Sequence, residues 1–334
     1  MVSVGYTLMT EQSGPRELVR HAVAAEDAGF DFAVSSDHYF PWLDEMGHSP
    51  NAWVTLGAVA RATGRIGLMT YVTAPTYRYH PAVVAQQAAT LQILSDNRFT
   101  LGLGSGEALN EHVVGTGWPS ADLRQERLVE AATIIARLFD GGYLTYQGRH
   151  FRIDSAKLWD LPERRVPVGI AVSGRQSCEL FAPLAEVMVG IDPNPELASW
   201  WDSARAGSEA GAGSGPSRKV GQLPISWGAD RAAAVSRAHE LFRWSLGGWK
   251  VNAELPGTAA FADAAATVRE SDVADQIPCG DDLGAVVAAA TAFVRAGYTD
   301  LALVQIGDER QAEFFEASGD IIRAIRGIAG SAGG

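Results

Sequence analysis

Cysteine is scarce in this chain of 334 residues, which contains only Cys178 and Cys279. Two cysteines so far apart form neither a Cys-x-x-Cys zinc motif nor a disulfide framework, so we expect two buried thiols in a reducing cytoplasm. Histidine spacings that ligate metals are absent, and so is the Gly-x-Ser-x-Gly motif of serine hydrolases. The sequence therefore predicts no metal site and argues against metal-dependent or serine hydrolysis.

Long apolar runs and excess positive charge are lacking as well. No stretch of about 18 apolar residues occurs, so we expect no membrane-spanning helix. No basic segment precedes the strand-like run at Val2, which argues against a signal peptide. Lys and Arg number 27 against 39 Asp and Glu, a net charge of −12. Because nucleic-acid binding usually needs a basic patch, we expect a cytoplasmic protein with neither a nucleic-acid nor a membrane partner.

Strand-like and helix-like segments alternate along the chain, and hydrophobic residues make up 47% of it, enough for a large core. The predicted strands are 2–6, 30–36, 67–72, 99–103, 168–172, 187–191, 220–227 and 301–306. The predicted helices are 15–28, 81–94, 123–139, 176–184, 229–246, 283–296 and 309–325. About eight strands in β-α order with short connections favour the α/β class, as a closed (β/α)₈ TIM barrel rather than an open sheet.

Three segments interrupt this alternation. Residues 144–151 look like a short antiparallel pair with Gln147-Gly148 at its turn, and residues 247–276 form a long insertion before the last βα unit. The stretch 206–217, rich in Gly, Ala and Ser, is expected to be a mobile surface loop. We therefore expect residues 1–334 to form a single barrel domain with insertions near 144–165 and 247–276.

Polar residues follow the second predicted strand, at the end where a (β/α)₈ barrel carries its functional groups. Ser35-Ser36-Asp37-His38 is followed by the aromatic cluster Tyr39-Phe40-Pro41-Trp42. Asp37 can accept a hydrogen bond from a ligand, and His38 can act as acid, base or donor near neutral pH. The alternative is an Asp–His pair that only caps the next element.

The fourth predicted strand runs into the segment Gly102-Leu103-Gly104-Ser105-Gly106-Glu107. Alternate glycines let the backbone approach a ligand closely, but the spacing is neither a Rossmann fingerprint nor a P-loop. A carboxyl group at the barrel mouth, walled by Trp42 and other aromatic side chains, suits acid–base chemistry. Glu107 is thus a candidate proton donor or acceptor, and an exposed loop glutamate is the alternative.

A later loop, Ser173-Gly174-Arg175-Gln176, leads from a strand into a helix. Small residues at a helix N-terminus can form an anion site, and Arg175 adds positive charge. A simple N-cap by Ser173 is the alternative. The end of the third predicted strand, Tyr71-Val72, is by itself a plain strand end.

Taken together, these motifs resemble the F420-dependent glucose-6-phosphate dehydrogenase group of the bacterial luciferase-like superfamily. The segments that carry the resemblance are Ser36-Asp37-His38 with Pro41-Trp42, Pro75-Thr76-Tyr77-Arg78-Tyr79-His80-Pro81 and Gly104-Ser105-Gly106-Glu107-Ala108-Leu109-Asn110-Glu111. It covers the first half of the chain well and the rest more weakly. It implies a barrel oxidoreductase that moves a hydride between a sugar or alcohol carbon, or the corresponding carbonyl, and coenzyme F420.

The resemblance also implies roles for individual residues. His38, Trp42 and Glu107 would face the substrate carbon, with Glu107 as the acid–base group, His38 orienting the hydroxyl and Trp42 shielding the site. Asp37 would contact the deazaflavin, and Val72 would lie at a non-proline cis peptide behind its ring. The other residues expected beside the cofactor are Tyr71, Gly106, Asn110, Ser173, Gly174, Arg175 and Gln176.

Two departures from the family pattern bear on the substrate. The family's sugar-phosphate site has two lysines and an arginine, and the corresponding residues here are Asn194, Lys250 and Gln276. With one cation left, a dianionic phosphate would be poorly held, so we expect a neutral sugar, alcohol or ketone at these residues. In addition, Ala74 stands where the family often places a hydroxyl near the cofactor.

Two other functions remain open at this point. An FMN-dependent monooxygenase of the same superfamily would share the barrel and differ in cofactor. A non-catalytic deazaflavin-binding protein would keep Asp37 and the glycines but would not need Glu107. The resemblance also implies a homodimer, for which Trp200 and Trp201 are candidate interface residues, although core packing would explain both tryptophans equally well.

Overall fold

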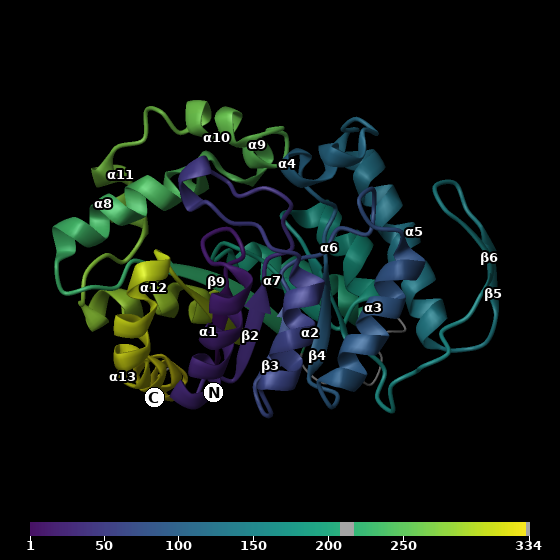
Figure 1. Ribbon diagram of the computed structural model, residues 1–334, viewed down its shortest axis with the longest axis horizontal. Coiled ribbons are helices and arrows are strands. Elements are labelled where there is room, and N and C mark those ends of the chain that lie inside the picture. The colour runs from purple at the N-terminus through teal and green to yellow at the C-terminus, as the bar shows by residue number, and fades with distance from the viewer. Residues whose placement is uncertain (208–216, 332–334) are drawn as a thin grey trace.

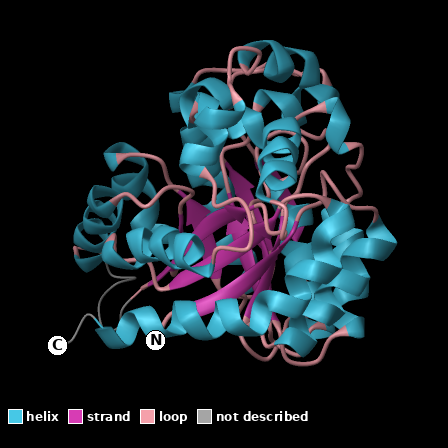
Figure 2. Ribbon diagram, turned by 90° about the vertical axis from the view of Figure 1, so that its left-hand side faces the viewer, coloured by secondary structure: helices cyan, strands magenta, loops and turns pink. Residues whose placement is uncertain are grey.

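Eight parallel strands close into a barrel in the computed structural model, which describes residues 1–207 and 217–331. The order around the barrel is β1-β10-β9-β8-β7-β4-β3-β2. The strands are β1 (Ser3–Leu8), β2 (Phe32–Ser35), β3 (Gly67–Thr70), β4 (Phe99–Leu103), β7 (Val168–Ala171), β8 (Val187–Val189), β9 (Arg218–Ile225) and β10 (Asp300–Gln305). Figure 2 shows this barrel in magenta with helices around it. The prediction of a (β/α)₈ TIM barrel is confirmed.

Helices cover the outside of the barrel. The longer ones are α1 (Pro15–Ala28), α2 (Ala52–Ala62), α3 (Pro81–Leu94), α5 (Ala121–Phe139), α7 (Pro195–Ala206), α8 (Arg231–Phe242), α12 (Leu283–Arg295) and α13 (Gln311–Ser331). Local signals set their ends: α1 has Pro15 in its first turn and ends at Gly29, whose φ of +91° suits glycine. Two of these helices, α2 and α7, were not predicted, although each begins at an asparagine cap, Asn51 and Asn194.

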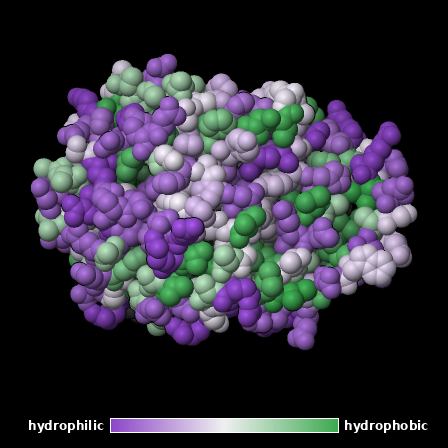
Figure 3. Space-filling view, viewed as in Figure 1, coloured by the Kyte–Doolittle hydropathy of each residue, from purple (hydrophilic) through white to green (hydrophobic). Residues whose placement is uncertain are grey.

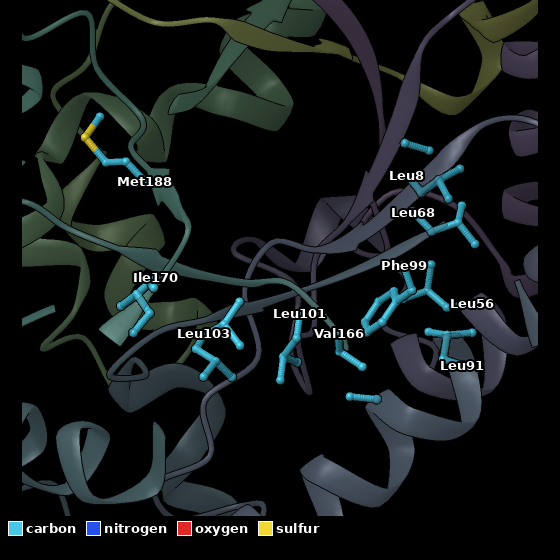
Figure 4. Close-up of a cluster of buried hydrophobic side chains, with 14 of the residues drawn as sticks. Leu8, Leu56, Leu68, Leu91, Phe99, Leu101, Leu103, Val166, Ile170 and Met188 are labelled. Carbon is cyan, nitrogen blue, oxygen red and sulfur yellow. The ribbon is translucent and has the colours of Figure 1, made fainter. Parts of the chain in front are cut away.

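The core has two layers, inside and outside the barrel. The inner cluster consists of Phe32, Val34, Met69, Val187, Val189, Val220 and Ala302. The outer cluster joins strand side chains to the helices, and Figure 4 shows Leu56 of α2 and Leu91 of α3 beside Leu68 and Phe99 of the barrel. Full burial of each such side chain contributes about 1.5–3 kcal/mol, so this double layer is a rigid support for the loops at the strand ends.

The two predicted insertions both contain regular structure. The first is a hairpin of β5 (Leu144–Gln147) and β6 (Arg152–Ala156), which projects from the barrel in Figure 1. The second was expected only as an insertion, but it holds the short helices α9 (Trp249–Asn252), α10 (Thr258–Ala264) and α11 (Glu270–Gln276). Figure 1 places α9 next to α4 (Ala108–Glu111), and the Ala108 amide donates to the Ala253 carbonyl at 3.0 Å. This insertion therefore packs on the loop that follows β4.

Hydrophilic side chains are spread over the face shown in Figure 3, as the net charge of −12 requires. Among the described residues, no helix has both the length and the apolar character needed to cross a membrane. The predicted mobile loop at 206–217 falls largely on residues 208–216, which lie outside the described part of the chain.

Candidate active site

Four neighbouring strands bring polar residues to one edge of the barrel. Leu8 pairs with Ser35, Ser35 pairs with Thr70, and β3 pairs with β4, so β1, β2, β3 and β4 end side by side. The loops that follow them carry chemistry-bearing side chains, as expected at the C-terminal face of a (β/α)₈ barrel. We call Glu11, His38, Trp42 and Glu107 the rim site.

His38 lies between two carboxyl groups from different loops. Its Nδ1 is 3.1 Å from Glu11 Oε1 and its Nε2 is 3.4 Å from Glu107 Oε2. The Phe40 carbonyl also lies 3.3 Å from Nδ1. Because the Glu11 carboxylate and the Phe40 carbonyl both accept hydrogen bonds, Nδ1 carries a hydrogen. The other ring nitrogen, Nε2, faces Glu107. The side chains of His38 and Glu107 are 8% and 13% exposed, so the pair is shielded from bulk water but not sealed.

Glu11 is a site residue that the sequence reasoning missed. It is 1% exposed, and its Oε2 accepts hydrogen bonds from the hydroxyls of Ser36, at 2.5 Å, and Thr10. These bonds hold the carboxylate against the imidazole and compensate for the burial of its charge. The sequence did hold a signal for it. Glu11 comes three residues after the end of β1, and any polar residue just after a barrel strand is a candidate site residue.

Trp42 forms the apolar wall of the rim site. Its ring lies 4.7 Å from the His38 ring and stacks on Trp244, with centroids 4.1 Å apart and 11° between planes. Phe261 of the second insertion meets it edge-on at 5.1 Å. The insertion thus holds Trp42 beside His38, and the burial of Trp42 suits a shielding role.

Asp37 lies among hydrogen-bond donors of the protein. Its side chain is fully buried, and its carboxylate accepts hydrogen bonds from Thr73 Oγ1 at 2.6 Å, Arg78 Nη1 at 3.2 Å and Tyr79 Oη at 3.3 Å. The sequence predicted contact with a ligand. That contact stays a prediction; in the structure this carboxylate has protein donors, because the segment after β3 folds over it.

Asn110 also has protein partners, and its predicted contact with the cofactor tail stays a prediction. Its side-chain oxygen accepts from the amides of Tyr39 and Phe40, and its Nδ2 donates to Glu107 Oε2 at 2.7 Å. Asn110 therefore joins the loop after β2 to the loop after β4 and orients Glu107.

The ends of β3 and β4 come into close contact. The Tyr71–Val72 peptide is cis, as the resemblance implied, and the Tyr71 hydroxyl donates to the Gly190 carbonyl at 2.8 Å. A Cβ built on Gly104 would lie 2.5 Å from Val72 Cγ2. Gly106 has a φ of +85°, which suits glycine. Gly104 thus allows close contact between the two strand ends, and close approach of a ligand at these glycines stays a prediction.

Tyr71 and Val72 also form a half-exposed apolar surface. With Ala171 at the end of β7, they pack on the inner barrel cluster. An apolar floor at the mouth, next to the polar rim site, fits one face of a planar ring.

The loop Ser173–Gln176 lies at the N-terminus of α6 (Arg175–Phe181) and is largely exposed. The alternative of an N-cap by Ser173 is wrong, because Gly174 is the cap residue and Ser177 Oγ accepts from the amides of Ser173 and Gly174. Arg175 pairs with Glu179 at 2.7 Å. Gln176 lies 3.4 Å from Asp122.

The three residues expected at the substrate have separate local environments. Asn194 caps α7 by accepting from the amides of Glu196 and Leu197. Lys250 is exposed on α9, and Gln276 is exposed at the end of α11. Among the described contacts, none joins the three side chains into one anion site.

A cavity of about 640 Å³ lies outside the rim site, between η1 (Asp44–Met46), α8 and η5 (Asp308–Arg310). Its charged groups are largely paired with each other or with neighbours, as in Glu45 with Arg243 and Arg310 with Glu313. We place the candidate chemistry at the rim site instead, because there, among the described residues, an imidazole meets one buried and one half-buried carboxyl group. No cluster of His, Cys, Asp and Glu with the geometry of a metal site occurs in the described ranges.

Comparison with known proteins agrees with this architecture. The family model for the luciferase-like monooxygenases matches residues 2–312. The chain belongs to this family. A solved F420-dependent secondary alcohol dehydrogenase, in complex with an F420-acetone adduct, is 25% identical and superposes with a TM-score of 0.88 over 97% of this chain and 99% of its own.

Curated relatives from the luciferase-like family are F420-dependent dehydrogenases. An F420-dependent glucose-6-phosphate dehydrogenase of Kineococcus radiotolerans is 32% identical over 97% of each chain. An F420-dependent hydroxymycolic acid dehydrogenase of Mycobacterium tuberculosis is 37% identical over 88% of this chain and 80% of its own. The glucose-6-phosphate dehydrogenase of Microbacterium testaceum is 44% identical, but the match spans only 57% of either chain. The resemblance noted from the motifs is therefore confirmed at the level of the family.

Proposed function

We propose that this chain is an F420-dependent oxidoreductase that transfers a hydride between an alcohol carbon, or the corresponding carbonyl, and coenzyme F420. The observation that carries the proposal is the contact of His38 with both Glu11 and Glu107 beside Trp42 at the barrel mouth. The F420-dependent relatives support the choice of cofactor.

The described residues fit a deazaflavin. Tyr71, Val72 and Ala171 provide an apolar floor for its ring, and the positive φ of Gly106 turns the backbone beside that floor. The anionic tail would be held on the neighbouring loop, where Ser173, Arg175 and Gln176 are exposed and Gly174 is half-buried. Asp37 and Asn110 would hold the loops around the cofactor in place through their hydrogen bonds to the protein. When bound, F420 supplies the hydride acceptor or donor.

The rim site supplies the proton chemistry. When an alcohol is oxidised, the C–H hydride leaves carbon and Glu107 accepts the hydroxyl proton; in the reverse direction Glu107 returns that proton to the carbonyl oxygen. His38 orients the hydroxyl through Nε2, while Glu11 fixes the imidazole through Nδ1. Trp42 keeps bulk water from the reacting carbon.

We propose that the substrate is a neutral alcohol, sugar or ketone and not selectively a sugar phosphate. Lys250 is the one cation among the three expected substrate residues, and Asn194 is used to cap α7. A single exposed lysine holds a dianion weakly.

A panel assay tests the proposed function. Purified protein is mixed with oxidised F420 and with glucose 6-phosphate, glucose or 2-propanol, while the loss of deazaflavin absorbance is followed; parallel assays replace F420 with FMN. We expect turnover with F420 and a neutral alcohol, and weaker turnover with the phosphate. Turnover with FMN and oxygen alone would contradict the proposal, and a preference for the phosphate would contradict the substrate assignment.

We further propose that the chain is a single catalytic domain that forms a homodimer in the cytoplasm. Trp201 is not an interface residue of this dimer, because it is fully buried in the chain and its indole donates to Ser217 Oγ. Exposed apolar side chains on α2 and α3, among them Val54, Val83 and Ile93, support it instead. Light scattering at the working enzyme concentration should show the mass of two chains, and a monomer would refute the dimer.

A further inference from the structure

Arg78 belongs to a segment that the sequence singled out but to which the proposed chemistry gives no role. It lies in the loop after β3, and its side chain is only 10% exposed. A buried guanidinium needs partners for its charge and its donors. Arg78 finds them on the loops that carry His38 and Glu107.

The first set of partners is on the loop after β2. Arg78 Nη2 donates to the Asp37 carbonyl oxygen at 2.6 Å, and Nη1 lies 3.2 Å from Asp37 Oδ1. Tyr79 Oη reinforces this contact by donating to the same carboxylate oxygen at 3.3 Å. Because Asp37 directly precedes His38, these bonds fix the backbone from which the imidazole projects.

The second partner is Glu111, one helical turn after Glu107. The Arg78 amide donates to Glu111 Oε2 at 2.8 Å, and Nε lies 3.5 Å from Oε1. Within α4, the Glu111 amide in turn donates to the Glu107 carbonyl at 3.1 Å. Glu111 is 1% exposed, so water does little to stabilise a negative charge on its carboxyl group, and that charge depends on Arg78.

We propose that Arg78 is a positioning residue that sets the spacing between His38 and Glu107 by joining the loops after β2, β3 and β4. This inference rests on the proposed function, in which those two side chains handle the proton. A planar guanidinium can bond the two loops at once, whereas a lysine ammonium is a single point charge on a flexible stem. Arg78→Lys therefore keeps the buried charge and the backbone amide bond to Glu111, but it loses the simultaneous guanidinium contacts with Asp37 and Glu111.

Hydrogen exchange of the protein without cofactor tests the positioning directly. We expect Arg78→Lys and Arg78→Gln to speed amide exchange in peptides covering 37–40 and 107–111, with α12 and α13 unchanged. Arg323→Gln is the matched control, because Arg323 is an exposed arginine on α13 that pairs with the exposed Asp320. Unchanged exchange in both peptides would overturn the inference. Should Arg78→Gln fail to fold because two buried carboxyl groups lose their cation, Arg78→Lys alone decides.

Steady-state kinetics with the best substrate of the panel provides the functional readout. For Arg78→Lys we expect kcat to fall about tenfold or more, with KM and the F420 dissociation constant changed less than kcat, because misplacement of reacting groups acts on the chemical step. A folded variant with kcat within about twofold of wild type would overturn the inference. If wild-type protein neither binds nor reduces F420, the proposed function fails, and the exchange experiment still decides whether Arg78 positions the two loops.

Discussion

At the residue scale, His38 makes different contacts with its two carboxyl partners. Glu11 is deeply buried and bonded to Ser36 and Thr10, so it is fixed before any ligand arrives. Glu107 is more exposed and has Asn110 as its side-chain partner besides the imidazole. The buried glutamate therefore suits an orienting role, and the more exposed one suits proton exchange with a substrate.

Replacing Glu107 with glutamine tests its assignment as the acid–base group. Glutamine keeps the shape and the bond with Asn110 but cannot accept a proton, so we expect kcat to fall by roughly 10²- to 10⁴-fold. The F420 dissociation constant, measured by fluorescence, should change little. Glu316→Gln is the control, because Glu316 is an exposed residue of α13. An unaffected rate of hydride transfer would point to another acid or to the binding-protein alternative.

At the element scale, the ends of β3 and β4 act as one unit. Thr73 forms an isolated bridge with Leu103, and backbone bonds run from Thr73 to Gly102 and from Gly104 to Thr73, each 2.9 Å. This contact fixes the apolar floor at Val72 relative to the loop that carries Glu107. A change at either strand end is therefore expected to disturb both.

Gly104→Ala tests this contact. Its added methyl group would lie 2.5 Å from Val72 Cγ2, so we expect a loss of about 1–3 kcal/mol in the free energy of unfolding and weaker F420 binding. Gly57→Ala in α2 is the matched control, because no atom lies within 4 Å of its added Cβ. That change should be neutral or stabilising by up to about 1 kcal/mol. Equal stability of the two variants in urea unfolding would refute the prediction.

At the scale of the whole molecule, buried carboxyl groups make stability depend on pH. Burial raises the pKa of Glu111 from 4.5 to about 7, and Arg78 opposes that rise only in part. The native state thus binds the Glu111 proton more tightly than the unfolded state does. The protonated Glu111 therefore contributes to the free energy of unfolding. This contribution is fully present below pH 4.5 and is lost as pH rises to about 7.

Glu111→Gln should remove this component of the pH dependence. Because glutamine resembles the protonated acid, the Tm of the variant relative to wild type should rise between pH 5 and pH 8. The shift corresponds to about 3 kcal/mol of unfolding free energy at most. Differential scanning calorimetry of both proteins at several pH values measures it. A Tm difference that is constant across this range would show that Glu111 titrates normally.

Much of the fold could be predicted because its signals are local. The bounds predicted for α1, α3 and β4 match the structure, since Pro15, Pro81 and Gly29 mark helix ends and apolar runs mark strands. The helix α2 was missed despite the cap at Asn51. Unlike α1 and α3, it has no proline in its first turn to mark where it begins.

The sequence by itself determined the order of strands and helices and the placement of His38, Trp42 and Glu107 after strand ends, because periodicity and capping act between near neighbours in the chain. Only the tertiary structure decided that Glu11 contacts Ser36 and His38, that Arg78 contacts Asp37 and Glu111, and that Asn110 bonds to the loop after β2. Those contacts join residues 25 to 71 positions apart. Their distances exist only once the strands have paired in register and the barrel has closed.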